Sequence, residues 1–372
     1  MKVLDILGEP IVKGGQESFI LNMYSNMDKD KIQIDVYTPF FCENNDFKNG
    51  IEKNGGKVYI GNSKFDKNKK TVFKNSVKEF LKNNKYDTVH IQSGSIYSLM
   101  IGAKIAKKLG VKNVIVHSHC GGFVNFKYKI IKFLSAYNLN KYPTEFWACS
   151  NLAAEWKFPK KIIKQKKYKI INNAIDTSKI YYSEEIRNKT RESLNLENKL
   201  VVGHIGRFAK QKNHSFLIDI FNEIHKINDQ SILLLIGTGE LQDEIKKKVC
   251  EFKLEDNVKF MGIRTDICEC LNAMDVFVLP SYFEGLPVVG VEAQATGLPI
   301  VTSTDVTNEL PIKNLVFQYS LQENAEIWAK EILKIVKSIK RKNTTKEIKD
   351  CKYDVITAAK LMQEEYLKLN NK

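Results

Sequence analysis

Glu284 and Glu292 are two carboxylates that could accept hydrogen bonds from a ligand, and seven residues separate them in an otherwise apolar segment. Pro287 is typical of the first position of a helix, which places Glu292 about a turn and a half inside it. Burying a carboxylate among small apolar residues costs free energy of folding unless a partner donates hydrogen bonds to it. Vicinal hydroxyls of a sugar or ribose are natural donors. A favourable position near the helix dipole would explain Glu284 but not Glu292.

Two cations, Arg207 and Lys212, lie where a predicted strand ends and a helix begins. At a helix N-terminus such a pair can neutralise a diphosphate, Arg with two donors and Lys as a point charge. A solvated basic loop is the alternative. The carboxyl end of a strand favours the functional interpretation, because ligands of doubly wound sheets bind there.

Two glycine-rich turns follow other predicted strands. Gly14 and Gly15 precede a helix whose free N–H groups suit phosphate, although an ordinary turn explains them as well. The pattern is neither a dinucleotide fingerprint nor a Walker loop, which argues against a dehydrogenase. The turn at 237–240 is explained equally well by turn geometry or by backbone approach to a ligand.

His117 and His119 end a predicted strand, and a histidine there is expected to face a ligand. A metal site needs more ligands than this pair offers. Cys268 and Cys270 lie two residues apart in a helical pattern and do not face each other. The single Asp-x-Asp, Asp28–Asp30, lies in a predicted surface turn. We therefore expect no metal and no cofactor.

Short apolar runs alternate with amphipathic helical patterns, and the whole alternation occurs twice. Such alternation predicts parallel sheets with helices on both faces. The fold class is α/β, with two doubly wound Rossmann-like domains whose strand ends face a central cleft. The predicted strands are Val3–Leu7, Ile32–Thr38, Lys57–Ile60, Thr88–Gln92, Asn113–His117, Glu145–Cys149, Lys169–Ile171, Leu200–Ile205, Ser231–Ile236, Val258–Met261, Val276–Leu279 and Ile300–Thr302.

The expected domains are 1–180, on the acceptor side, and 181–340, which binds the nucleotide. The polar stretch 176–199 is predicted to be the linker between the two domains. Two C-terminal helices are expected, separated by a basic break at 341–349. Residues 341–372 are expected to pack back on the first domain.

The composition is that of an ordinary globular protein, with 372 residues, 43% hydrophobic and 27% charged. Seven cysteines at irregular spacing indicate a reduced, intracellular chain rather than a disulfide framework. Neither a signal peptide nor an apolar run of 18 residues is evident. The expected location is the cytoplasm, or the periphery of the membrane's inner face.

The formal net charge of +15 is unevenly distributed, because residues 51–170 hold 25 Lys or Arg and only 6 Asp or Glu. This predicts an anionic partner: a phosphorylated ligand, a nucleic acid or an acidic membrane surface. A generally lysine-rich composition is the alternative. In the segment Lys127–Lys141, an apolar stripe bordered by Lys127, Lys129 and Lys132 suits an anionic bilayer. A helix packed on its own sheet explains it equally well.

Together these motifs resemble the retaining nucleotide-sugar glycosyltransferases of the GT-B fold, glycosyltransferase family 4, and most of all the bacterial capsule and exopolysaccharide type. The resemblance covers nearly the whole chain and is strongest over 200–310. Its most specific mark is Glu-Gly-Leu-Pro followed by Glu-Ala at Glu284 and Glu292. Gly-Arg-Phe at Gly206 and Gly-Gly-x-Glu at Gly14 support it. Gln294-Ala295-Thr296 is a minor departure from the family pattern.

The resemblance implies a role for each motif. Glu292 would bind ribose hydroxyls, while Glu284 and Gly285 would contact the donor sugar. Arg207 and Lys212 would hold the diphosphate and stabilise the charge that develops during transfer. The Gly15 N–H would contact the phosphates, and the loop carrying Gly262 and Arg264 would lie near the base. His119, or alternatively His117, would contact the donor sugar.

The implied activity is transfer of a sugar with retention of configuration, without a metal. UDP is the commonest nucleotide of the family, and GDP is the alternative. The acceptor would be a glycan or a lipid-diphosphate-linked sugar, and no nucleic acid would take part. Two rivals remain: a UDP-sugar 2-epimerase of the same fold, and a non-catalytic nucleotide-sugar-binding subunit.

Overall fold

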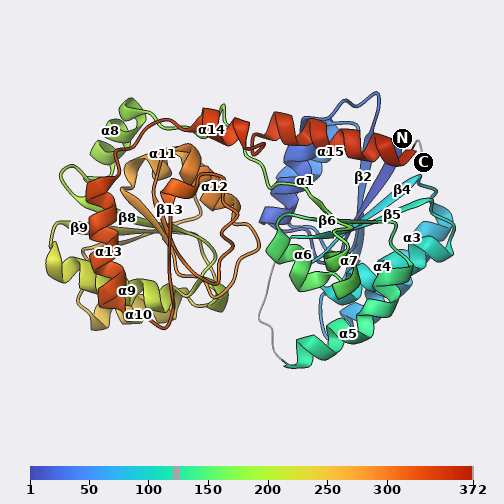
Figure 1. The fold of residues 1–372 in the computed structure, drawn as a ribbon, viewed down its shortest axis with the longest axis horizontal. Helices are drawn as coiled ribbons and strands as arrows, with labels where there is room; N and C mark the ends of the chain where they lie inside the picture. Colours follow the sequence, from blue (N-terminus) through green and yellow to red (C-terminus); the bar gives the residue numbers. More distant parts are fainter. Residues whose placement is uncertain (120–125, 371–372) are drawn as a thin grey trace. The chain divides into compact units, whose positions relative to one another are not determined.

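The computed structural model describes residues 1–119 and 126–370, and the chain divides into two compact units (Figure 1). Met1–Ala174 and Asp354–Lys372 form the first unit, and Ile175–Tyr353 form the second. The stretch 176–199 therefore belongs to the second unit instead of separating the two. Residues 341–353, which we expected in the returning tail, also belong to the second unit.

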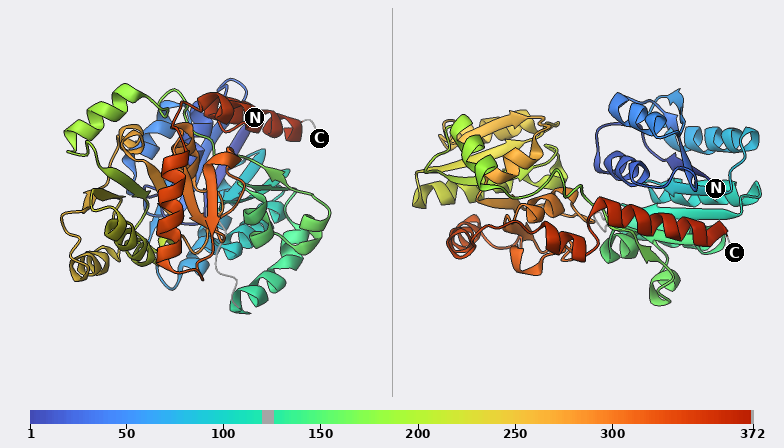
Figure 2. Two further views of the ribbon diagram at one scale, coloured as in Figure 1. Left: turned by 60° about the vertical axis from the view of Figure 1, so that its left-hand side comes forward. Right: turned by 90° about the horizontal axis from the view of Figure 1, so that it is seen from above.

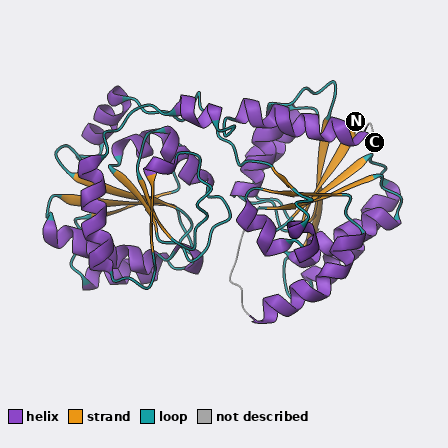
Figure 3. Ribbon diagram, in the orientation of Figure 1, coloured by secondary structure: helices purple, strands orange, loops and turns teal. Residues whose placement is uncertain are grey.

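The first unit is a parallel sheet with helices on both faces (Figure 3). Its strands are β1 (Lys2–Leu7), β2 (Gln33–Phe40), β3 (Val58–Ser63), β4 (Thr88–Gln92), β5 (Asn113–Ser118), β6 (Glu145–Ala148) and β7 (Lys169–Ile170). Its helices are α1 (Gly15–Ser25), α2 (Asn45–Lys53), α3 (Lys69–Asn83), α4 (Ile96–Lys108), α5 (Phe126–Lys141), α6 (Asn151–Lys157), α7 (Lys160–Lys164) and α15 (Val355–Asn370). Among the described residues the strand order is β3-β2-β1-β4-β5-β6-β7.

The second unit repeats this plan of a sheet flanked by helices, as the right-hand view in Figure 2 shows. Its strands are β8 (Leu200–Ile205), β9 (Ser231–Ile236), β10 (Val258–Gly262), β11 (Val276–Leu279), β12 (Ile300–Ser303) and β13 (Val316–Tyr319). Its helices are α8 (Glu184–Ser193), η1 (Lys210–Lys212), α9 (His214–Ile227), α10 (Gln242–Glu251), α11 (Ile267–Ala273), α12 (Val288–Ala295), η2 (Lys313–Leu315), α13 (Ala325–Ser338) and α14 (Thr345–Asp350). The strand order is β10-β9-β8-β11-β12-β13.

The predicted fold class is confirmed, and burial explains why the strands were recognisable. All six residues of β9 are buried, as in a parallel sheet covered on both faces. The strand that the sequence did not predict, β13, lies at the edge of its sheet and is only half-buried. Its short run Val316–Tyr319 therefore lacks a continuous apolar pattern.

Partly buried arginines tie the polar stretches to the second unit. Arg187 and Arg191 of α8 form ion pairs with Asp275. Arg341 donates to the backbone oxygens of Asn272 (2.8 Å) and Met274 (2.7 Å), and burial lowers the pKa of its guanidinium to about 9. The basic segment 341–349 is thus packed structure, and it contains the start of α14.

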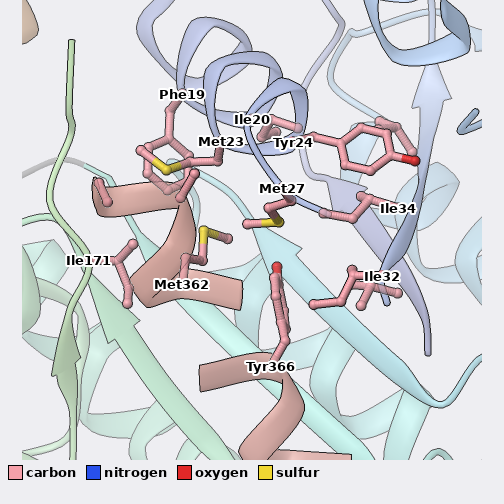
Figure 4. Packing of buried hydrophobic residues seen from close by; sticks show 14 of the residues in the cluster. Phe19, Ile20, Met23, Tyr24, Met27, Ile32, Ile34, Ile171, Met362 and Tyr366 are labelled. Atoms are coloured by element: carbon pink, nitrogen blue, oxygen red, sulfur yellow. The ribbon is translucent and has the colours of Figure 1, made fainter. Parts of the chain in front are cut away.

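Helix α15 packs against α1 in the hydrophobic core of the first unit (Figure 4). Met362 and Tyr366 project from α15 into the cluster that holds Phe19, Met23 and Met27. The C-terminal helix therefore contributes to the same core as the N-terminal strands. Among the described residues, no helix is both long and apolar enough to cross a bilayer.

Each sheet has one point at which the order of the strands reverses. In the first unit it lies between β1 and β4, and in the second between β8 and β11. Loops that follow such a pair leave in opposite directions, which opens a crevice at the carboxyl ends of the strands. These two edges are the places to look for ligand-binding side chains.

Candidate functional site

An ion pair between Lys212 and Glu284 occupies the reversal point of the second unit. Lys212 Nζ lies 2.6 Å from Glu284 Oε1, and the side chains are 16% and 11% exposed. Lys212 ends η1 after β8, and Glu284 follows β11, so the neighbouring strands bring together residues 72 positions apart. Glu284 Oε2 has no hydrogen bond to any described residue, which leaves it open to a hydroxyl donor.

Two hydrogen bonds to backbone oxygens hold the two loops of this pair together. Gln211 Nε2 donates to the Phe283 oxygen, and the Tyr282 N–H donates to the Gln211 oxygen, both at 2.9 Å. Glu284 also forms a parallel bridge with Val306. The positions of the cation and the carboxylate are therefore set before any ligand arrives, a condition for effective electrostatic stabilisation.

Arg207 lies on the same β8–α9 loop but is exposed. Its Nε lies 3.1 Å from Glu240 Oε2, and the side chains are 74% and 53% exposed. Exposed pairs of this kind contribute only about 0–1 kcal/mol. Arg207 can therefore exchange Glu240 for a stronger anionic ligand at small cost.

The glycine-rich turn at 237–240 is explained by packing against its own domain. A Cβ atom on Gly239 would lie 2.6 Å from the Phe208 oxygen, and one on Gly237 would lie 2.2 Å from the Gly206 oxygen. Gly237 also has φ +128°, which side-chain-bearing residues rarely adopt. Turn geometry, rather than approach to a ligand, accounts for these glycines.

Glu292 is a half-buried carboxylate on α12 with no side-chain hydrogen bond among the described residues. Burial raises the pKa of its carboxyl from 4.5 to about 7. The helix begins at Val288, so Pro287 is its N-cap instead of its first helical residue. Nearby, Gln294 exchanges hydrogen bonds with the backbone of Ile312, so this departure from the family pattern has a structural role.

The loop after β10 carries the residues expected near the base. Arg264 Nε lies 2.8 Å from Asp266 Oδ1, so the guanidinium is held by its own loop. The Gly262 oxygen accepts a hydrogen bond from the Gly237 N–H at 2.8 Å. This bond joins the end of β10 to the loop that follows β9. Ile263 is 68% exposed and offers an apolar surface at the strand ends. None of the contacts among described residues joins Arg264 to Lys212.

In the first unit, Gly14 is the N-cap of α1 and lacks a side-chain cap, and the Glu17 carboxyl accepts from its own backbone N–H, so the N–H groups open to an anion are those before Glu17. A Cβ atom on Gly15 would meet nothing within 4 Å, whereas one on Gly14 would lie 2.8 Å from Glu17 Oε2. Glycine at position 15 is therefore not required by the protein's own packing.

Sequence reasoning assigned no role to two acids near the reversal point of the first unit. Glu9 Oε1 accepts from Ser93 Oγ at 2.7 Å, and burial raises the pKa of the Glu9 carboxyl. Burial, with a smaller contribution from Glu9, raises the pKa of Glu17 to about 7. The sequence signal that could have identified them was their position, since Glu9 and Ser93 lie within two residues of the ends of β1 and β4.

His117 in β5 and His119 just after it have different surroundings. His117 is fully buried, and its Nδ1 lies 3.1 Å from His90 Nε2. His119 is only partly buried, and its Nε2 lies 2.6 Å from Gln92 Oε1. Burial is the main cause that lowers the pKa of both rings, that of His119 to about 3. Only His119 is thus accessible to a ligand, and it is neutral at physiological pH.

Among the described residues, no three His, Cys, Asp or Glu side chains are grouped closely enough to hold a metal ion. Cys268 Sγ contacts the Tyr181 oxygen at 3.4 Å on buried helix α11. Asp28 accepts from the Asp30 N–H at 3.1 Å, a contact within its own turn.

Two family profiles match consecutive parts of the chain. The profile "Glycosyltransferase Family 4" matches residues 13–179, and "Glycosyl transferases group 1" matches residues 186–350. The putative glycosyltransferase EpsF of Bacillus subtilis (strain 168) is 29% identical over 332 residues, 86% of this chain and 84% of that protein.

A second relative is the UDP-Gal:alpha-D-GlcNAc-diphosphoundecaprenol alpha-1,3-galactosyltransferase of Escherichia coli, 30% identical over 64% of this chain and 63% of that protein. Two solved structures share the fold. Anabaena Alr3699/HepE in complex with UDP and glucose superposes with TM-score 0.75 at 20% identity, over 98% of this chain and 99% of that one. Sucrose-phosphate synthase of Thermosynechococcus elongatus superposes with TM-score 0.78 at 16% identity over the full length of both.

Proposed function

We propose that this chain, which belongs to the glycosyltransferases of the GT-B fold, transfers a sugar from a UDP-sugar to a glycan or lipid-diphosphate-linked acceptor with retention of configuration. The pathway would be synthesis of a bacterial surface polysaccharide. The name of the Escherichia coli relative, with its UDP-galactose donor and diphosphoundecaprenol acceptor, supports both substrate classes. The solved Anabaena complex with UDP and glucose supports the nucleotide.

The observation that carries this proposal is the Lys212–Glu284 pair at the reversal point of the second sheet. Lys212, joined by Arg207, would hold the diphosphate. Glu284 would use its open Oε2 to accept from a donor-sugar hydroxyl, with Gly285 beside it. Glu292, a carboxylate with no partner among the described residues, would accept from the ribose hydroxyls.

Charge moves onto the leaving diphosphate as the bond between the anomeric carbon and the phosphate oxygen breaks. Lys212 is held in place by Glu284 and would stabilise that charge without rearrangement. A leaving phosphate oxygen would take the proton of the attacking acceptor hydroxyl on the same face of the sugar, which retains the configuration. Gly262 and Arg264 would lie near the base, and Ile263 would offer it an apolar contact.

The first unit would contribute the backbone N–H of Gly15 to the phosphates and a ring nitrogen of His119 to the donor sugar. The open helix start at Gly14 supports the phosphate contact. The partial exposure of His119 supports its choice over the fully buried His117.

A radiolabelled UDP-sugar assay tests the proposed function. Incubation with membrane-extracted glycolipid acceptors is expected to yield labelled acceptor. Conversion of the sugar to its 2-epimer would instead indicate an epimerase, and binding alone a non-catalytic subunit.

We expect the same transfer to persist in excess EDTA, because in the proposed site Lys212, Arg207 and the helix start at Gly14 would supply the positive charge that a divalent ion would bring. The measurement is the initial rate with and without EDTA. Complete loss of activity in EDTA, with recovery on adding Mg²⁺ or Mn²⁺, would contradict this expectation.

We also propose that α5 lies on an anionic membrane. Four apolar side chains with helical spacing are exposed: Ile130 (44%), Phe133 (79%), Leu134 (67%) and Tyr137 (68%). The buried side of α5 includes Ser135 and Leu139 instead. The apolar stripe is thus on the solvent side, where an interfacial helix would need it. The side chain of Lys127 lies outside the described residues.

Cations line the groove beside this stripe. A pocket of about 640 Å³ between α5 and α6–α7 includes Lys129, Lys132, Lys160 and Lys161, against the single acid Glu155. Tyr128 stacks on Trp156 at 4.5 Å in the same groove. Exposed aromatic and apolar groups flanked by lysines complement anionic headgroups.

Vesicle co-sedimentation tests the membrane proposal. Changing Lys127, Lys129 and Lys132 to Gln is expected to weaken binding to anionic vesicles on the order of a hundredfold, since each lysine contributes about 1 kcal/mol. A Phe133→Ser/Leu134→Ser variant should also lose binding. The matched control is Ile356→Ser, an equally exposed apolar residue on α15. Wild type that stays in the supernatant at low salt would overturn the proposal.

A further inference from the structure

A chain of buried polar side chains reaches His119 from inside the first unit. Asp5 on β1 is 1% exposed, and Gln92 on β4 is fully buried. Gln92 Nε2 donates to Asp5 Oδ2 at 2.9 Å, and Gln92 Oε1 lies 2.6 Å from His119 Nε2. The chain therefore runs Asp5–Gln92–His119 across two neighbouring strands and ends on the accessible ring.

The direction of each hydrogen bond follows from the carboxylate at the buried end. A carboxylate only accepts hydrogen bonds, so the NH₂ group of Gln92 must face Asp5. The amide oxygen of Gln92 must then face His119, and an oxygen can only accept. His119 Nε2 therefore carries the proton, which leaves Nδ1 as the acceptor of the neutral ring.

The surroundings keep the ring neutral and fix its plane. Burial, together with His90 and Lys157, lowers the pKa of His119 to about 3. His117 stacks on the His119 ring at 4.1 Å, and Phe19 meets it edge-on at 5.0 Å. Nδ1 has no hydrogen bond among the described residues, and the ring is only partly buried.

A second branch of buried polar groups begins at the same carboxylate. Asp5 Oδ1 lies 3.2 Å from His90 Nδ1, and Tyr366 OH on α15 lies 2.6 Å from that nitrogen. This second branch makes no contact with the ring nitrogens of His119. A change in it can therefore serve as a control for changes in the Asp5–Gln92–His119 chain. Figure 4 shows Tyr366 projecting from α15 into the core.

We propose that Asp5 and Gln92 are positioning residues that hold His119 in the Nε2–H tautomer, so that its Nδ1 accepts a hydrogen bond from a sugar hydroxyl. The choice of a sugar as the ligand rests on the proposed function. A histidine held as an acceptor selects a hydroxyl donor, and a site built for a hydroxyl strongly rejects the analogue that lacks it. The relay would thus set specificity for a hydroxylated sugar at that position.

The test is the ring nitrogen spectrum of the full-length, ligand-free protein labelled with ¹⁵N-histidine. Long-range proton–nitrogen correlation distinguishes a protonated from an unprotonated nitrogen. The chain has six histidines, and the signal lost in His119→Gln assigns the ring. The wild type is expected to show protonated Nε2 and unprotonated Nδ1. A His119 ring protonated at Nδ1 in the wild type would overturn the proposal.

Asp5→Asn removes the constraint, because an asparagine satisfies Gln92 in either amide orientation. The protonated Nε2 signal of His119 should be lost in whole or in part, and kcat/KM should fall roughly tenfold. The control is Tyr366→Phe, which removes a hydroxyl from the second branch and should leave the His119 signals unchanged. Unchanged signals in folded Asp5→Asn would refute the relay. If His119 shows the expected tautomer but the protein has no transferase activity, only the proposed function would be refuted.

Discussion

Lys212→Ala is expected to lower kcat/KM about a hundredfold or more, the usual range for removal of one preorganised donor to a developing charge. The structure gives a second reason for a large effect. Lys212 Nζ lies 2.6 Å from Glu284 Oε1, and both side chains are largely buried. The variant thus loses the diphosphate contact and leaves Glu284 without its cation. The measurement is steady-state transfer, with a thermal melt to check folding.

The matched control is Lys210→Ala, on the same η1 helix but exposed and without an ion pair among the described residues. It should retain activity near that of the wild type. The kcat/KM of Arg207→Ala should lie between those of the two lysine variants, about tenfold below wild type, because one charge-assisted contact with the diphosphate is lost. The loss is smaller than for Lys212 because Arg207 is exposed and its pair with Glu240 holds it only weakly in place. Full activity in both Lys212→Ala and Arg207→Ala would remove the basis for assigning the diphosphate to this loop.

UDP affinity is expected to depend on the ionisation of Glu292. Burial raises the pKa of this carboxyl to about 7, and only the carboxylate accepts from both ribose hydroxyls. As pH falls from 8 to 6, binding should weaken roughly tenfold, as expected for one group titrating near 7. Glu292→Gln should bind UDP on the order of tenfold more weakly at pH 8, since two charge-assisted hydrogen bonds become neutral ones.

Isothermal titration at several pH values and in buffers of different ionisation enthalpy checks this expectation. Because the phosphate of UDP also titrates in this range, the decisive quantity is the difference in pH dependence between wild type and Glu292→Gln. Identical pH profiles would contradict the ribose assignment.

The raised pKa has a matching consequence for stability. Between about 4.5 and 7 the folded state holds the Glu292 proton more tightly than the unfolded state. The unfolding free energy of the ligand-free protein should therefore fall as pH rises through that window and level off above it. Glu17, whose pKa is also about 7, contributes in the same direction, so Glu292→Gln should remove only part of this slope.

The sequence alone determined the fold class and most strands, because parallel strands covered on both faces are continuous apolar runs between helical patterns. It also located the loops that we propose to hold the donor, since Arg207, Lys212 and Glu284 come after such runs. It was misleading where polar residues are buried by specific partners. Arg187 and Arg341 gave their segments the composition of a linker, yet both guanidinium groups bind backbone oxygens of the second unit.

Only the tertiary structure decided which of these residues meet. Lys212 pairs with Glu284 across 72 positions because β8 and β11 are neighbours, and strand order is a long-range property that local patterns do not encode. The sequence could not choose between His117 and His119, because residues two apart on a strand point to the same face. The choice depends on what packs over each ring: His117 is enclosed by His90, Phe19 and Trp147, whereas His119, one step past the strand end, remains partly open. The ionisation of Glu292 is decided in the same way, because a pKa depends on the surroundings that the folded chain assembles around the carboxyl.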